Sequence, residues 1–100
     1  MNTARYKHWW YGIVFAMICH YANGSGNTEQ GRIIEKAVEK AIKATAKYDN
    51  YRYRLQVIEL IFYRGYSIPK AANMVHVSER TAQRWKNQFV NEVGKNAGFE

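Results

Sequence analysis

The chain has 100 residues, 47% of them hydrophobic and one of them proline, which suits a single folded domain and excludes a disordered or collagen-like chain. Its 15 Lys and Arg residues against 8 Asp and Glu give a formal net charge of +7, which favours an anionic partner such as nucleic acid. The only cysteine, Cys19, excludes a disulfide within the chain and makes a reducing cytoplasm the expected location.

The first predicted helix is unusually apolar. It extends from about Ala4 to Tyr21, and its residues 9–19, WWYGIVFAMIC, are apolar or aromatic almost throughout. A bilayer span needs about twenty such residues, and the following HYANGSG is a poor signal-peptide cleavage site. We therefore expect no membrane partner and a helix buried on most of its circumference, in the core or at a subunit contact.

A second helix is predicted after the polar, glycine-rich stretch NGSGN at 23–27. Asn27 and Gln30 have the spacing of a capping box. The stripe expected to face the core consists of Ile33, Ile34, Ala37, Val38, Ala41 and Ile42. The opposite side carries a row of basic residues: Arg32, Lys36, Lys40, Lys43 and Lys47. This row is interpreted as a solvated face, with phosphate contact as the alternative.

A third helix is predicted over 51–65, YRYRLQVIELIFYRG, with Asp49 as its N-cap and Gly65 as its C-terminal cap. Its run of apolar residues leaves little polar surface, so it is expected to be the central, buried helix. A fourth helix should begin at Ser67, because Pro69 is tolerated in a first helical turn.

The stretch SIPKAANMVHVSERTAQRWKNQF, residues 67–89, has the pattern of a helix-turn-helix. Ala71 and Ala72 are small enough for a helix crossing, His76 lies at the turn, and Ser78 can cap a fifth helix that ends near Val93. Most such turns have glycine where His76 stands, but histidine enters the left-handed region more readily than most residues. The stripe predicted to face inward consists of Thr81, Ala82, Trp85, Phe89 and Val93.

The opposite face of this last helix carries side chains suited to reading bases. They are Arg80, Gln83, Arg84, Asn87 and Asn91. Arg matches guanine and Gln or Asn matches adenine in the major groove. Ser78 with the helix N-terminus can hold a backbone phosphate, and Lys70 and Lys86 are expected to touch phosphates too. The alternative is a helical hairpin whose outer face is merely polar.

Two resemblances extend this interpretation. RLQVIELIFYRGYSIPKAANMVHVSERTAQRW resembles region 4 of bacterial sigma factors, which recognises the −35 promoter element. The whole chain resembles the RinA-like late transcriptional regulators of phages of Gram-positive bacteria, through YKHWWYGIVFAMICHY, TEQGRIIEKAVEKAI and RWKNQFVNEVGKNAGF. This implies a phage or prophage protein in a bacterial host cell that activates late packaging or lysis genes, with double-stranded promoter DNA and host RNA polymerase as partners.

The sequence thus predicts an all-α fold, a small bundle of about five helices with a C-terminal helix-turn-helix. Within one domain, 1–100, residues 1–48 would form an N-terminal hairpin and 50–97 the sigma region 4-like DNA-binding region. Dimers that bind two half-sites gain specificity, so we expect self-association through the aromatic helix. The residues expected at that contact are Trp9, Trp10, Ile13 and Met17.

Two other functions remain open, a phage terminase small subunit that binds DNA for packaging and a protein-interaction module that does not bind DNA. An enzyme is not expected, because the adjacent Cys19 and His20 would project about 100° apart on a helix. His8, His20 and His76 lack metal-ligand spacing, so neither a metal nor a cofactor is expected.

Overall fold

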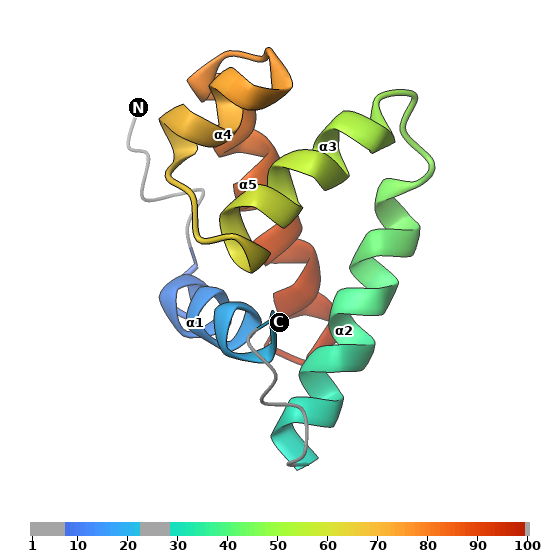
Figure 1. The fold of residues 1–100 in the computed structure, drawn as a ribbon. Coiled ribbons are helices and arrows are strands. Elements are labelled where there is room, and N and C mark those ends of the chain that lie inside the picture. The colour runs from blue at the N-terminus through green and yellow to red at the C-terminus, as the bar shows by residue number, and fades with distance from the viewer. Residues whose placement is uncertain (1–7, 23–28, 100) are drawn as a thin grey trace.

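The structure, a computed structural model, describes residues 8–22 and 29–99 and is helical, with no strand in these two ranges. This confirms the all-α bundle with the helix-turn-helix at its C-terminal end (Figure 1). The helices are α1 (Tyr11–Ala22), α2 (Glu29–Thr45), α3 (Tyr51–Ile58), the π-helical segment η2 (Glu59–Tyr63), α4 (Ile68–Val75) and α5 (Glu79–Asn96).

Helix α5 occupies the centre of the bundle and packs against α1, α2, α3 and α4 (Figure 1). The prediction that the third helix is central is therefore wrong. The exposed Arg52, Tyr53 and Gln56 keep one side of α3 in solvent, whereas the buried face of α5 extends over most of its length. The buried residues of α5 are Ala82, Trp85, Phe89, Val90, Val93 and Gly94.

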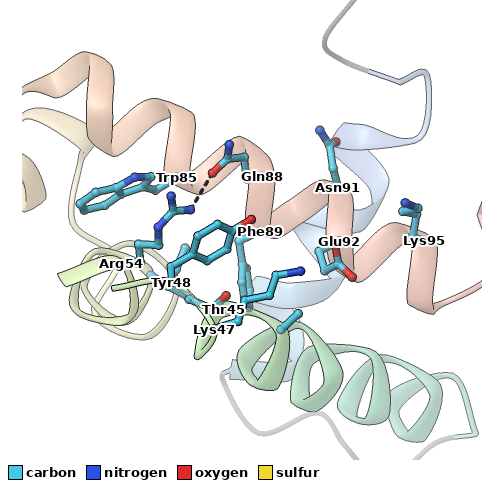
Figure 2. Close-up of a pocket in the computed structure, with 12 residues that line it drawn as sticks. Thr45, Lys47, Tyr48, Arg54, Trp85, Gln88, Phe89, Asn91, Glu92 and Lys95 are labelled. Atoms are coloured by element: carbon cyan, nitrogen blue, oxygen red, sulfur yellow. Dashed lines mark hydrogen bonds between the residues drawn. The ribbon is translucent and has the colours of Figure 1, made fainter. Parts of the chain in front are cut away.

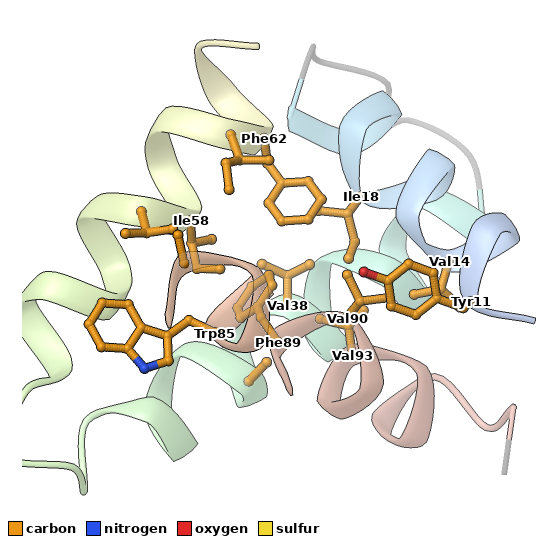
Figure 3. Packing of buried hydrophobic residues seen from close by; sticks show 14 of the residues in the cluster. Tyr11, Val14, Ile18, Val38, Ile58, Phe62, Trp85, Phe89, Val90 and Val93 are labelled. Atoms are coloured by element: carbon orange, nitrogen blue, oxygen red, sulfur yellow. The ribbon is translucent and has the colours of Figure 1, made fainter. Parts of the chain in front are cut away.

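One core joins residues from all the helices (Figure 3). Phe62 of η2 lies between Phe15 of α1 and Phe89 of α5, with ring centroids 5.0 and 5.9 Å away. From α2, the core receives Ile34, Ala37, Val38 and Ala41. Ile33 and Ile42, which were predicted in the same stripe, are exposed because the other helices cover only one side of α2.

The N-terminal helix starts later than predicted. Residues 1–7 lie outside the described ranges, but His8, Trp9 and Trp10 precede α1 rather than forming its first turns. Trp10 is 2% exposed and its ring packs so closely on Gly94 that a Cβ there would overlap ring atoms. Trp10 therefore belongs to the core, and its predicted place in a subunit contact is wrong.

The ends of the helices follow the predicted signals in most places. Gly65, with φ +70°, follows η2, and the Tyr66 N–H donates to the Leu60 carbonyl at 2.9 Å. Asp49 is not the cap of α3, because Asn50 holds that position and its side-chain oxygen accepts from Arg54 Nε at 2.8 Å. Asn27 and the side chain of Gln30 lie outside the described part of the chain.

Candidate nucleic-acid interface

Two serine caps and one left-handed residue shape the helix-turn-helix. Ser67 Oγ accepts from the Lys70 N–H at 3.4 Å, and Ser78 Oγ accepts from the Thr81 N–H at 3.0 Å. Between the two helices, His76 has φ 65° and ψ 41°, and the Val77 N–H donates to the Ala72 carbonyl at 3.0 Å. The three local predictions, at Ser67, His76 and Ser78, are confirmed.

Small side chains allow α4 and α5 to cross closely. Ala71 and Ala72 on α4 and Ala82 on α5 are fully buried, and Val75 lies beside them in the core. The short side chains permit close backbone approach, and Val77 anchors the turn against the core. The crossing buries the Ala82 side of the first turns of α5, and the opposite side stays exposed.

The exposed first turns of α5 carry two arginines. Arg80 and Arg84 are one helical turn apart, both are exposed, and neither forms an ion pair within residues 8–22 and 29–99. Lys70 of α4 is also exposed, with its Nζ 4.3 Å from the Tyr66 ring centroid. The structure therefore leaves the Arg80 and Arg84 guanidinium groups open to solvent beside a helix N-terminus.

Farther along α5, helix α1 covers part of the predicted base-reading face. Gln83, Lys86 and Asn87 are half-buried. The Tyr11 hydroxyl donates to Asn87 Oδ1 at 2.5 Å, and Gln83 Nε2 donates to the same oxygen at 3.0 Å. Lys86 Nζ lies 5.8 Å from the centroid of the Tyr11 ring. Sequence reasoning missed Tyr11, because nothing in an apolar run shows a contact with a residue 76 positions away.

Asn91 does not share the outward face on which it was predicted. Its Oδ1 is buried and has no hydrogen-bond partner among the described residues. Asn91 also borders a pocket of about 250 Å³ between α2, α3 and α5 (Figure 2). In this pocket the Arg54 guanidinium carbon lies 3.9 Å from the Tyr48 ring centroid, and Nη1 donates to Gln88 Oε1 at 2.8 Å. Arg54 thus ties α3 to α5.

No group of three or more His, Cys, Asp or Glu side chains that could hold a metal ion occurs in 8–22 and 29–99. Among the helices described, none has the length and apolar character needed to cross a membrane.

The chain was also compared with known families, proteins and structures. Residues 54–95 match a family described as "Helix-turn-helix domain". Neither the curated proteins nor the solved structures gave a match. The matched segment begins in α3 and contains α4, the left-handed turn and nearly all of α5. Domains of this type bind DNA and are typically non-enzymatic. Geometry and family match agree that residues 54–95 form a helix-turn-helix domain.

Proposed function

We propose that this protein is a sequence-specific DNA-binding transcriptional regulator that reads the major groove with the first turns of α5. The observation that carries the proposal is the pair Arg80 and Arg84, exposed and without ion pairs in the described ranges, on the second helix of a helix-turn-helix. Each guanidinium can donate two parallel hydrogen bonds to guanine O6 and N7.

Phosphate contacts are proposed for the surfaces that flank these arginines. Ser78 Oγ is already engaged with Thr81, accepting from its N–H and donating to its Oγ1 at 2.9 Å. Its role is therefore to present the free N–H groups of the first turn of α5 to a phosphate. Lys70 and Lys86 supply positive charge on either side, and the net charge of +7 strengthens all such contacts.

Replacing Arg84 by alanine should reduce discrimination between the preferred and a scrambled duplex by about 1–3 kcal/mol, the usual worth of a bidentate guanine contact. Fluorescence anisotropy at fixed salt measures both affinities. Arg32→Ala is the matched control, since Arg32 is also an exposed arginine but lies on α2. Unchanged discrimination in the Arg84 variant would remove it from the base-reading set.

We further propose that the regulator activates late genes of a phage, such as packaging or lysis genes, and contacts host RNA polymerase. The support is the resemblance to RinA-like regulators and to sigma region 4, together with the helix-turn-helix domain. In vitro transcription with purified host polymerase tests this proposal. A late promoter should give more transcript with the protein than without it, and a decrease would indicate a repressor.

Self-association is proposed through the apolar surface at the start of α1, formed by Trp9 and Ile13. Their side chains are 81% and 49% exposed, and the half-buried Met17 lies farther along the helix. A second copy is the proposed occupant, because two helix-turn-helix units can contact two half-sites of one duplex.

Changing Trp9 to Glu should convert a dimer into a folded monomer that binds duplex more weakly. Analytical ultracentrifugation at micromolar concentration measures the mass. Tyr53→Glu is the control, because Tyr53 is another exposed aromatic residue, at 55%, but lies on α3. A wild-type mass of 11.7 kDa with full operator binding would contradict the dimer.

A further inference from the structure

Tyr11 connects the N-terminal helix to the base-reading surface. Its side chain is 8% exposed, and its ring lies between α1 and α5 with the Phe15 centroid 6.4 Å away. The hydroxyl donates to Asn87 Oδ1 at 2.5 Å. Burial raises the pKa of Tyr11 to about 12, so at neutral pH the hydroxyl retains the proton that it donates.

Asn87 connects Tyr11 to Gln83 by hydrogen bonds. The Asn87 Oδ1 atom accepts from both Tyr11 and Gln83 Nε2, the second at 3.0 Å. A carbonyl oxygen has two lone pairs, so these two donors fill its ordinary capacity. The Asn87 amide therefore has a defined orientation, and Gln83 lies one helical turn closer to the N-terminus of α5.

The hydrogen bond to Asn87 leaves Gln83 with a specific set of groups. One of its two amide hydrogens is donated to Asn87 Oδ1. The other amide hydrogen and Oε1 can then form hydrogen bonds with a base. A donor beside an acceptor is the pattern that adenine requires, because adenine offers N7 as acceptor and N6–H as donor in the major groove. Guanine offers two acceptors there, so a glutamine amide held in this way disfavours guanine.

We propose that Tyr11 is a positioning residue for base recognition, which holds the Gln83 amide through Asn87 in the orientation that reads an adenine. This inference rests on the proposed function, and it assigns Asn87 an internal role in place of a direct base contact. Without the Tyr11 hydroxyl, the Asn87 amide can rotate to offer Nδ2 toward Gln83. The Gln83 amide must then turn to keep its hydrogen bond, which disturbs the adenine pattern.

The test compares three variants on duplexes. Duplexes preferred by the wild type are first selected from a randomised pool, and single-base variants of the best duplex are then measured by anisotropy. Gln83→Ala identifies the position that Gln83 reads, and it should lose about tenfold preference for adenine there, a typical value for such a contact. Tyr11→Phe should lose most of the same preference at the same position, with other positions unaffected. Tyr21→Phe, near the far end of α1, is the matched control and should match the wild type.

The possible outcomes separate the inference from the function on which it rests. If Gln83→Ala loses the adenine preference and Tyr11→Phe retains it, the positioning role is wrong and the proposed function stands. If Tyr11→Phe weakens all duplexes equally, Tyr11 only supports the fold, and the inference is overturned. If Gln83→Ala leaves every preference intact, Gln83 reads no base and the inference also fails. A wild type that selects no sequence contradicts the proposed function itself.

Discussion

Replacing Trp10 by alanine is expected to lower the free energy of unfolding by about 3–5 kcal/mol, as for other buried aromatic residues. Trp10 is 2% exposed, packs on the backbone at Gly94, and lies with its ring centroid 5.8 Å from that of Phe99. Its removal leaves a cavity between the start of α1 and the end of α5. Urea unfolding followed by circular dichroism measures the change.

Trp9 provides a matched control for this variant. It is the neighbouring residue of the same type, but it is 81% exposed. At protein concentrations low enough for the monomer to predominate, Trp9→Ala should change stability by no more than about 0.5 kcal/mol, as is usual for surface positions. Equal losses for the two tryptophans would show that the chain does not turn into the core at Trp10.

Replacing Trp85 by alanine should also lower stability by about 3–5 kcal/mol, because Trp85 is 5% exposed within the core. Trp85→Phe should lose much less than the alanine variant. The indole Nε1–H has no hydrogen-bond partner within the described residues, so phenylalanine keeps most of the ring and removes a buried, unsatisfied donor.

The adjacent Arg84→Ala is the control for Trp85, because Arg84 is exposed on the other side of α5. It should leave stability within about 0.5 kcal/mol of the wild type. Urea unfolding of the three variants checks the order. A stable Trp85→Ala protein would show that the helix has a different rotational phase, and the assignment of Arg80 and Arg84 to the outer face would then be wrong.

Local chemistry made the helix-turn-helix predictable from the sequence. A serine N-cap accepts a hydrogen bond from the backbone N–H three residues later, so it depends only on the local sequence. Ser67 and Ser78 both form this hydrogen bond. The left-handed conformations of Gly65 and His76 likewise follow from the ends of the preceding helices. The inward phase of α5 followed from periodicity, and the burial of Trp85 and Phe89 confirms it.

Tertiary packing decided the features that the sequence did not reveal. Helical periodicity cannot separate Trp9 from Trp10, because both residues precede α1. Only the packing of the Trp10 ring against Gly94, which has no side chain, shows which of the two is buried. The contact between Tyr11 and Asn87 joins residues 76 positions apart. Helix α5 is central because four other helices pack on it, although its composition is more polar than that of the third helix.

In the candidate site, too, the sequence predicts local features but not contacts between distant residues. Its exposed arginines could be identified from helical spacing, since the side of α5 that carries Arg80 and Arg84 remains exposed in the described part of the chain. Asn87 and Asn91 have the same spacing, but Asn87 accepts a hydrogen bond from Tyr11 of α1, and the side-chain oxygen of Asn91 is buried. Their residue types suit base recognition, and only the structure shows that both side chains are partly covered.

We expect the first turns of α5 to enter the groove of a DNA duplex. A nuclear magnetic resonance titration of the ¹⁵N-labelled protein with its preferred duplex tests it most directly. Amide shifts should change most at residues 67–71 and 78–84, and little along the row of basic residues that begins at Arg32. Changes centred on Arg32, Lys36, Lys40, Lys43 and Lys47, with none at 78–84, would contradict the account.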